Sequence, residues 1–221
     1  MTPLGLKEFS IVVAMDRKRG IGNKGDLPWP KLKGDMKFFR ELTTCPDREA
    51  VEKRWGFRGE ESGETTAWSG VLGMLKFAHR LPEATEARNN AVIMGRKTWE
   101  SLPLAYRPLP DRKNGVLSLL GYTAEGAGIT HQATSWHQML FDADRRETSE
   151  IMVIGGGQIF RVALSQTECA HLYVTEIDAA FECDTFFPET PDFAPAAFSP
   201  WIEENGIRYR FTRWDRVSES H

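Results

Sequence analysis

The most informative stretch for the fold is Val92-Ile93-Met94-Gly95-Arg96-Lys97-Thr98-Trp99, an apolar run that passes through one glycine into a charged segment. A second junction of this kind is Val153-Ile154-Gly155-Gly156-Gly157-Gln158. Each is typical of a buried strand that enters a helix, and a helix N-terminus offers unpaired N–H groups and a positive dipole end to a phosphate. Together the two junctions could grip both phosphates of a dinucleotide, although a triple glycine alone is usually a tight turn. Neither has the GxGxxG spacing of an ordinary Rossmann unit.

Outward from these junctions, apolar runs alternate with helix-like segments. The predicted buried strands, rich in Val and Ile, are Phe9 to Met15, Ala91 to Met94, Val116 to Leu120, Ile151 to Ile154 and Leu172 to Ile177. The predicted helices are Asp35 to Leu42, Lys97 to Leu102, Ser135 to Ala143 and Gln158 to Leu164. This order predicts an α/β protein with a central, mostly parallel sheet flanked by helices. The alternating segment Gly206 to Trp214, after the turn Glu204-Asn205-Gly206, predicts an antiparallel C-terminal strand.

One segment, Cys45 to Asn90, interrupts this rhythm and contains no convincing strand. Its part from Gly56 to Gly70 is rich in Gly, Glu, Ser and Thr, which is typical of a surface loop. Within it, one apolar helix face is predicted to dock on the surface, formed by Val71, Leu72, Leu75, Phe77, Ala78 and Leu81. We therefore expect a single domain over residues 1–221 with a surface insertion at about 45–90.

The composition excludes several classes of protein. A chain of 221 residues with 41% hydrophobic residues can bury a full core by itself, and its formal net charge of -3 argues against a basic nucleic-acid surface. The three cysteines, Cys45, Cys169 and Cys183, are scattered and have no metal-ligand spacing, so neither a disulfide framework nor a metal site is expected. The chain shows neither a secretory signal nor a membrane-spanning stretch, and a cytoplasmic location fits these features best.

The loop before the first predicted helix is Gly20-Ile21-Gly22-Asn23-Lys24-Gly25-Asp26-Leu27-Pro28-Trp29. Its glycines permit close backbone approach to a ligand, although glycines alone would also suit an ordinary loop. Asp35 follows and opens a helix with an apolar face. An isolated Asp in a first helical turn usually complements the helix dipole. After Leu27-Pro28-Trp29 and before Phe38-Phe39, however, we expect Asp35 at the edge of an apolar pocket, where it can accept two hydrogen bonds from a planar, amidine-like edge.

The chain resembles the dihydrofolate reductase family from about Phe9 to Trp214, outside the insertion. The joint order and spacing of the matching segments make the resemblance specific. They are Ile11-Val12-Val13-Ala14, Gly20-Ile21-Gly22, Leu27-Pro28-Trp29, Asp35 through Phe39, Met94 through Trp99, Arg107-Pro108-Leu109, Ile154 through Gly157, and Asp184-Thr185-Phe186-Phe187-Pro188. The insertion resembles those of certain protozoal reductases that are fused to thymidylate synthase, so the chain could be a domain of such a bifunctional protein.

The resemblance implies an acid and a substrate pocket. Asp35 would pair with the amino group and ring nitrogen of the pterin, Thr175 would belong to the same polar network, and Trp29 would hold an ordered water. The substrate contacts would include backbone carbonyls of Val12 and Ile154 and the Arg112 guanidinium, which would clamp the glutamate carboxylate. The other substrate-binding residues implied are Val13, Leu27, Met36, Phe39, Leu102, Pro103 and Leu109. For Phe39 by itself, core packing would be the more common role.

The resemblance also implies NADPH as the cofactor and no metal. The cofactor-binding residues implied are Ala14, Ile21, Gly22, Gly25, Asp26, Gly95, Arg96, Lys97, Thr98, Ser118, Gly155, Gly156, Gly157, Gln158, Ile159 and Phe160. Three features depart from the family pattern. Phe160 replaces a usual Tyr, Asp111 through Gly115 replaces a usual Gly-Arg and strand start, and Leu119 and Gln158 stand where polar or basic anchors for the 2'-phosphate are common. A preference for NADPH over NADH would then rest mainly on Arg96, with a hydroxyl from Ser118.

The reaction implied is reduction of 7,8-dihydrofolate to 5,6,7,8-tetrahydrofolate, with hydride transfer to pterin C6 and protonation at N5. The loop from Gly20 to Leu27 would close over the nicotinamide. Dihydrofolate and antifolate inhibitors would be the ligands, and no nucleic acid or membrane is required. Two alternatives stay open: a pterin or nucleotide binding module without turnover, and a reductase that acts on a pyrimidine precursor of flavins.

Overall fold

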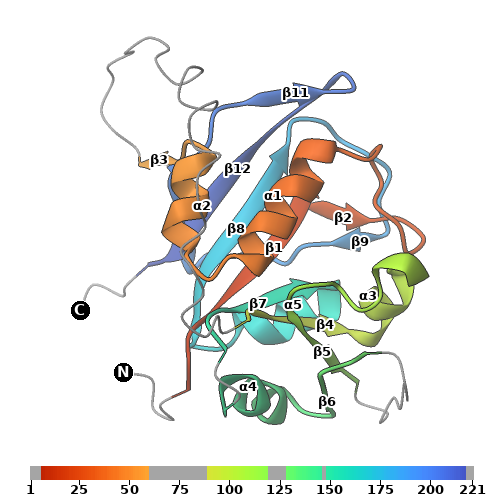
Figure 1. The fold of residues 1–221 in the computed structure, drawn as a ribbon. Helices are drawn as coiled ribbons and strands as arrows, with labels where there is room; N and C mark the ends of the chain where they lie inside the picture. The colour runs from red at the N-terminus through yellow and green to blue at the C-terminus, as the bar shows by residue number, and fades with distance from the viewer. Residues whose placement is uncertain (1–5, 60–88, 119–127, 146–147, 218–221) are drawn as a thin grey trace.

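The computed structural model describes residues 6–59, 89–118, 128–145 and 148–217 (Figure 1). A large sheet crosses the molecule in the strand order β3-β10-β12-β8-β1-β7-β4-β5-β6, and β11 pairs with β12. The strands are β1 (Phe9–Asp16), β3 (Arg58–Gly59), β4 (Ala91–Gly95), β5 (Lys113–Leu117), β6 (His131–Ala133), β7 (Ile151–Gly155), β8 (Cys169–Ile177), β10 (Phe193–Phe198), β11 (Ile202–Glu204) and β12 (Ile207–Arg216). Across the part of the chain that is described, no helix is long and apolar enough to cross a membrane.

The direction of the strands divides the sheet into two parts. β1 runs parallel to β7 and β8, and the parallel series continues through β4 and β5 to β6. β12 runs antiparallel to β8, β10 and β11. The predicted fold class, a mostly parallel sheet with an antiparallel C-terminal strand, is therefore confirmed.

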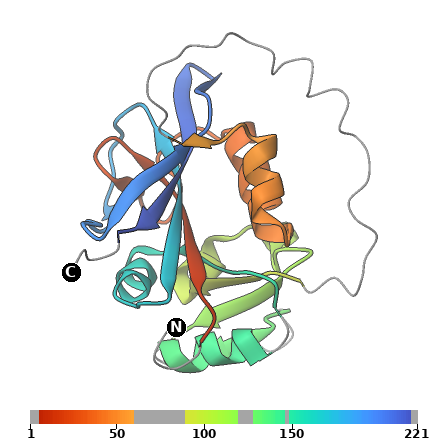
Figure 2. The same cartoon turned by 90° about the vertical axis from the view of Figure 1, so that its left-hand side faces the viewer.

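Helices cover both faces of this sheet. They are α1 (Lys33–Thr44), α2 (Arg48–Arg54), α3 (Arg96–Ser101), the short 3-10 turn η1 (Leu104–Tyr106), α4 (Trp136–Arg145) and α5 (Gly157–Leu164). Figure 2 shows α1 and α2 on one side of the sheet and α5 on the other. Successive side chains of β1 alternate between the two cores: Ile11 and Val13 pack in the cluster that includes residues of α4 and α5, whereas Val12 packs with those of α1 and α2. This alternation explains why both faces of the strand are apolar.

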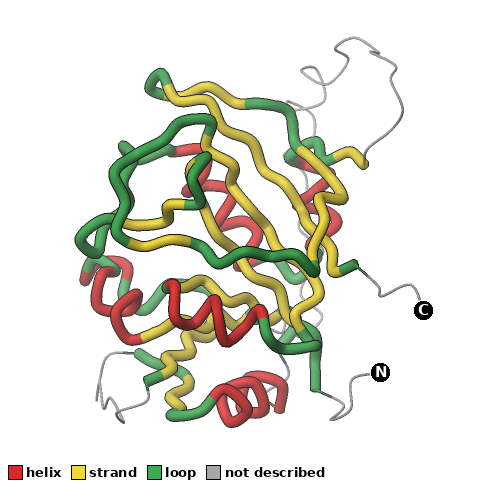
Figure 3. The backbone as a smooth tube through the Cα atoms, turned by 180° about the vertical axis from the view of Figure 1, so that it is seen from behind, coloured by secondary structure: helices red, strands yellow, loops and turns green. Residues whose placement is uncertain are grey.

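Two short antiparallel strand pairs complete the fold. β2 (Gly20–Gly22) pairs antiparallel with β9 (Thr185–Phe186), so the glycine loop lies against a segment far along the chain. Figure 3 shows from behind that β9 continues at both ends into long loops. β11 and β12 are joined by Asn205 and Gly206, which have φ angles of 54° and 73°. Two left-handed residues in a two-residue loop match the twist of the paired strands, as the Asn-Gly sequence predicts.

The structure corrects the predicted position of β5. The predicted strand from Val116 to Leu120 instead begins at Lys113 and ends at Leu117, and residues 119–120 lie outside the described residues. Asn114 made the strand start look polar, but its amide is satisfied inside the protein. Its Nδ2 donates to the carbonyls of Leu109 and Arg112 over 2.9 and 3.0 Å, and its Oδ1 accepts from the Leu109 N–H over 3.0 Å. A buried amide with these partners can occupy a strand.

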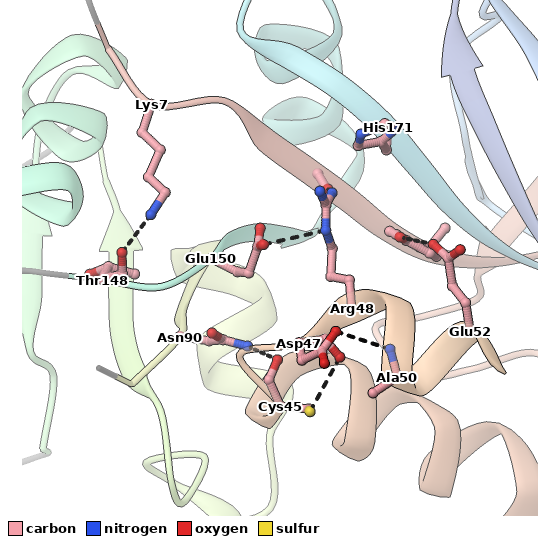
Figure 4. A network of polar contacts seen from close by, with 12 residues as sticks. Lys7, Cys45, Asp47, Arg48, Ala50, Glu52, Asn90, Thr148, Glu150 and His171 are labelled. Carbon is pink, nitrogen blue, oxygen red and sulfur yellow. Dashed lines mark hydrogen bonds and ion pairs between the residues drawn. The ribbon is translucent and has the colours of Figure 1, made fainter. Parts of the chain in front are cut away.

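The beginning of the predicted insertion belongs to the fold. Residues 45–90 were expected to contain no strand, but β3 pairs with β10 at the sheet edge, and α2 buries Val51. Asp47 caps α2 by accepting from the Ala50 N–H over 3.0 Å, and Arg48 reaches Glu150 over 3.4 Å (Figure 4). α2 was missed because it is short and highly charged. The remainder of the segment, residues 60–88, including the predicted apolar helix face from Val71 to Leu81, lies outside the described residues.

Candidate active site

The first turn of α1 places a carboxyl group inside the protein. Asp35 is 5% exposed, and its Oδ1 accepts a hydrogen bond from the Thr175 hydroxyl over 2.7 Å. Thr175 lies on β8 opposite Ala14 of β1, near the carboxyl ends of both strands. The helix directs Asp35 inward because Phe38 and Leu42, one and two turns further along, are anchored in the core.

The environment of Asp35 changes its acidity. Burial raises the pKa of the Asp35 carboxyl to about 6, the hydrogen bond from Thr175 opposes that rise, and the negative charge of Glu204 adds to it. No ion pair involves Asp35 among the residues that are described. A carboxyl with this pKa can gain or lose a proton near neutral pH, which suits acid–base chemistry.

Trp29 lies in the same cluster as Val12 and packs against Phe181 with ring centroids 5.9 Å apart. The indole is 4% exposed, and its Nε1–H donates to no described residue. A buried donor of this kind is normally satisfied by water or a ligand.

Apolar residues of the predicted substrate pocket come from several elements. Phe39 packs against the cluster of α1 and also against the cluster that contains Trp99 and Leu109, and Ile154 bridges the same two clusters. Leu102 joins the second cluster, whereas Leu27 is 45% exposed. Val13 faces the opposite core, with Ile11. The structure thus gathers Phe39, Leu102, Leu109 and Ile154, and leaves Leu27 and Pro103 at the surface. Met36 lies on α1 and is half-buried.

Arg112 is buried at 8% exposure next to this apolar group. Its Nε donates to the Pro110 carbonyl over 2.8 Å, Nη1 contacts the Thr43 hydroxyl, and the guanidinium lies 5.9 Å from the centre of the Phe39 ring. Burial lowers the pKa of Arg112 to about 10. The preceding Asp111 adopts a φ of 61°, a left-handed conformation that suits Gly better. No described carboxylate forms an ion pair with Arg112, so an anionic ligand group would compensate its buried charge.

The two glycine junctions lie next to each other. β4 pairs with β7, and Met94 is opposite Gly155, so α3 and α5 begin at the same edge of the sheet. A Cβ on Gly95 would lie 2.8 Å from Cγ1 of Ile159, and one on Gly156 would lie 3.2 Å from the Thr98 hydroxyl. Both positions therefore favour glycine. The N-terminal ends of α3 and α5, each with N–H groups that lack intrahelical partners, therefore lie at one edge of the sheet.

One basic residue at this edge, Arg96, forms an ion pair with a carboxylate of the same helix. Nη1 of Arg96 lies 2.9 Å from Oε1 of Glu100, and the Arg96 side chain is 40% exposed. Ser118 follows Leu117, which pairs with Gly95, so Ser118 and Arg96 leave adjacent strand ends. Lys97 and Gln158 are exposed. Leu119 lies outside the described residues. Phe160 is buried and packs edge-on against Phe187, 5.1 Å away.

The glycine loop is tied down by acids to which the sequence analysis assigned no role. Asp16 accepts from the N–H groups of Lys18, Gly20 and Phe181 over 2.8, 2.7 and 2.8 Å. Asp184 accepts from the Lys24 N–H over 2.7 Å, and this bond contributes most to lowering the pKa of its carboxyl. Asp184 was part of a recognised motif and Asp16 ends the first strand, which were the available signals. Ile21, Gly22, Gly25 and Asp26 lie in the loop that these two carboxylates hold.

A buried acid and two adjoining helix starts thus lie at the carboxyl ends of parallel strands, which is the edge where α/β proteins of this class place their ligands. A family model for dihydrofolate reductase matches residues 8–47 and 81–216, and leaves 48–80 unmatched. The chain belongs to the dihydrofolate reductase family.

Similar proteins are of two lengths. The chain is 37% identical to a bifunctional dihydrofolate reductase-thymidylate synthase of Glycine max, covering 97% of this chain and 34% of that protein. It is 31% identical to a dihydrofolate reductase of Aedes albopictus, covering 96% of this chain and 99% of that protein, and 30% identical to the Rattus norvegicus enzyme, covering 96% and 98%. The chain therefore spans about a third of the bifunctional relatives that it matches.

Proposed function

We propose that this chain reduces 7,8-dihydrofolate to 5,6,7,8-tetrahydrofolate, with NADPH as the hydride donor. The observation that carries the proposal is the Asp35 carboxyl, which is buried, accepts from the Thr175 hydroxyl over 2.7 Å and has its pKa raised to about 6. Family membership supports the same activity. An acid in an apolar surrounding is the complement of a planar ring edge that carries an amino group and a ring nitrogen.

The residues present fit a nicotinamide dinucleotide. The adjoining starts of α3 and α5 would offer N–H groups to a pyrophosphate, and a Cβ at Gly95 or Gly156 would crowd Ile159 or the Thr98 hydroxyl. Reduced nicotinamide, when bound, supplies the hydride that pterin C6 accepts. Thr98 and Ser118 would add hydroxyls, and Arg96 would supply the charge for a 2'-phosphate.

The chain's own residues would orient the substrate and deliver a proton. Asp35 would hold the amino group and ring nitrogen of the pterin, while the buried Nε1–H of Trp29 would fix a water on the path to N5. Backbone carbonyls of Val12 and Ile154 would bind the pterin region. Arg112 would bind the glutamate carboxylate, since it is buried without an ion-pair partner among the described residues. Phe39 and Leu109 would exclude water from the rings between these two ends.

A single assay separates this proposal from its alternatives. We expect the absorbance of NADPH to fall when dihydrofolate is added to the purified chain. Asp35→Asn keeps the size of the side chain but removes the charge and the proton, so turnover at neutral pH should fall about 10²-fold or more. Absence of turnover with retained pterin binding would favour a binding module, and turnover only with a pyrimidine precursor of flavins would favour the other reductase. Near-normal turnover of Asp35→Asn would refute the role of this acid.

We also infer that the natural protein carries thymidylate synthase on the same chain. The support is the higher identity to the bifunctional relative, 37%, than to the single-function reductase of Aedes albopictus, 31%. Sequencing the full transcript tests this, and a stop codon directly after the reductase would refute it.

We propose a reducing, cytosolic location, because the three cysteines are all free. Localisation of the tagged natural protein tests that.

A further inference from the structure

Helix α1, which carries Asp35, has no side-chain cap from its own N-cap residue. A helix start leaves its first N–H groups without intrahelical partners. Here the N-cap is Leu32, whose side chain cannot accept a hydrogen bond, and the Met36 N–H donates to the Leu32 carbonyl over 3.1 Å. The N–H groups of Lys33, Gly34 and Asp35 therefore need acceptors from elsewhere.

The β11–β12 hairpin supplies these acceptors. Oε1 of Glu204 accepts from the Lys33 N–H over 2.7 Å, and Oε2 accepts from the Gly34 N–H over 3.0 Å. Oε2 also accepts from the Tyr209 hydroxyl over 3.2 Å. The backbone N–H of Asp35 in turn lowers the pKa of the Tyr209 hydroxyl, against the larger opposing effect of burial. One carboxylate from the hairpin thus accepts from the first two N–H groups of the helix.

The contact between hairpin and helix is close. A Cβ on Gly34 would lie 2.1 Å from the Tyr209 hydroxyl oxygen, so a side chain at this position would displace the hairpin. Asn205, in the turn that follows Glu204, donates from Nδ2 to the Lys31 carbonyl over 3.3 Å. Glu204 is therefore held by the turn on one side and by Tyr209 on the other, with its carboxylate directed at the helix start.

We propose that Glu204 is a positioning residue for Asp35: it caps α1 from the distant hairpin and so fixes where the active-site carboxyl points. This inference rests on the proposed reductase function. Glu204 does not need to touch substrate or cofactor, because its effect passes through the backbone of Lys33 and Gly34 and through the charge it places beside Asp35.

The negative charge of Glu204 raises the pKa of Asp35. The polar groups that face Asp35 are Thr175 from β8, Glu204 from β11 and Tyr209 from β12. The N–H groups of Gly34 and Lys33 lower the pKa of Glu204, and the Lys33 ammonium lowers it further, so Glu204 is ionised where Asp35 titrates. A neighbouring negative charge disfavours a second one, and Glu204 accordingly contributes to the raised pKa of Asp35.

The test uses Glu204→Gln, which keeps an acceptor but removes the charge, and Glu204→Ala, which removes both. Glu203→Gln is the matched control, because Glu203 is an exposed carboxylate on the same strand. The titration of Asp35 is followed by carbon NMR of labelled aspartate carboxyl groups, with Asp35→Asn to assign the signal. Hydrogen exchange of the Lys33 and Gly34 amides is measured on the same proteins. Neither readout requires turnover.

We expect Glu204→Gln to shift the Asp35 titration to lower pH and Glu203→Gln to leave it unchanged. Glu204→Ala should speed exchange of the two amides by roughly tenfold, the factor typical of a lost N-cap, and lower kcat for dihydrofolate more than it changes KM. An Asp35 titration in Glu204→Gln that matches both parent and control would overturn the inference. If the parent failed to reduce dihydrofolate, the proposed function would fall, while the titration and exchange would still decide the role of Glu204.

Discussion

The Thr175 hydroxyl donates to Oδ1 of Asp35 over 2.7 Å although the two residues are 140 positions apart in the chain. β8 supplies the hydroxyl and α1 supplies the carboxyl, and both side chains are buried. The bond opposes the effect of burial on Asp35 because it stabilises the ionised form.

Replacement of Thr175 by Val should therefore move the Asp35 titration to higher pH, above its present value of about 6. The pH dependence of hydride transfer would move in the same direction. Thr212→Val is the control, since Thr212 is fully buried on β12 and its hydroxyl has no hydrogen-bond partner among the described residues. Removing an unsatisfied hydroxyl should leave the profile unchanged. A profile that is the same in Thr175→Val and the parent would show that the bond is unimportant for acidity.

The raised pKa of Asp35 should also make the ligand-free protein less stable as pH rises. Its folded-state pKa of about 6 exceeds the ordinary 3.8, so the folded state holds its proton more tightly than the unfolded state between those values. The free energy of unfolding therefore falls as pH rises from about 4 to about 6. A difference of about two pKa units corresponds to roughly 3 kcal/mol.

Asp35→Asn lacks this titration, so its stability relative to the parent should increase through the same pH window and stay constant above it. Urea unfolding of both proteins at intervals from pH 4 to pH 8 measures the difference. Parallel stability curves for the two proteins would mean that the Asp35 pKa is not raised in the folded state.

Arg96 provides a test of cofactor choice. One charge-assisted contact to a 2'-phosphate contributes about 1.5 to 3 kcal/mol, or roughly 10- to 150-fold in preference for NADPH over NADH. Arg96→Ala should therefore collapse the ratio of kcat/KM values by weakening NADPH while sparing NADH. The Arg96–Glu100 pair at 2.9 Å spans one helical turn at the surface, and such a pair contributes only about 0.5 kcal/mol. Glu100→Gln should accordingly retain or slightly increase the preference. Equal losses for both cofactors in Arg96→Ala would place the arginine at the shared pyrophosphate.

Two deletions distinguish the parts of the predicted insertion. The composition of residues 60–70 predicts a surface loop, and the length of a loop changes its closure entropy slowly. Removal of these residues should therefore leave folding and reduction largely intact. Removal of residues 56–70 should lower the melting temperature by several degrees. It takes away β3 and Phe57, whose ring lies 6.0 Å from that of Phe38 in the core. Equal melting temperatures for the two deletion variants would show that residues 56–59 add nothing to stability.

The strands that the sequence predicted well are those buried on both faces, since continuous apolar runs such as Phe9 to Met15 have no competing interpretation. The missed strands are short or carry residues that oppose a strand. β10 contains Pro195, which lies where its pairing with β12 shifts register. β3 and β9 have two residues each, too few for any pattern to be visible.

At the candidate site, motif spacing drew attention to Asp35, and resemblance drew attention to Thr175. The structure places the two in contact, while their roles stay predictions. Glu204 could not be found in this way, and although Asp184 lay in a recognised motif and Asp16 at the end of a predicted strand, neither signal indicated what these carboxylates bind. Glu204 and Asp184 accept from backbone N–H groups that are remote in sequence, and Asp16 accepts from the remote Phe181 N–H as well as from nearby ones. No local pattern records which distant N–H groups lack a partner.

The place of the β11–β12 hairpin in the chain affects how the protein is made. The residue that caps α1 follows it by 171 positions, so at about 5 to 20 residues per second a ribosome completes the helix roughly ten to thirty seconds before the cap exists. Once β8 has been made, it also lacks its antiparallel neighbour until β12 follows. A nascent chain therefore leaves the first turn of α1 without its cap, and β8 with an open edge, until the β11–β12 hairpin emerges. Protection by chaperones during translation would act on this half of the sheet.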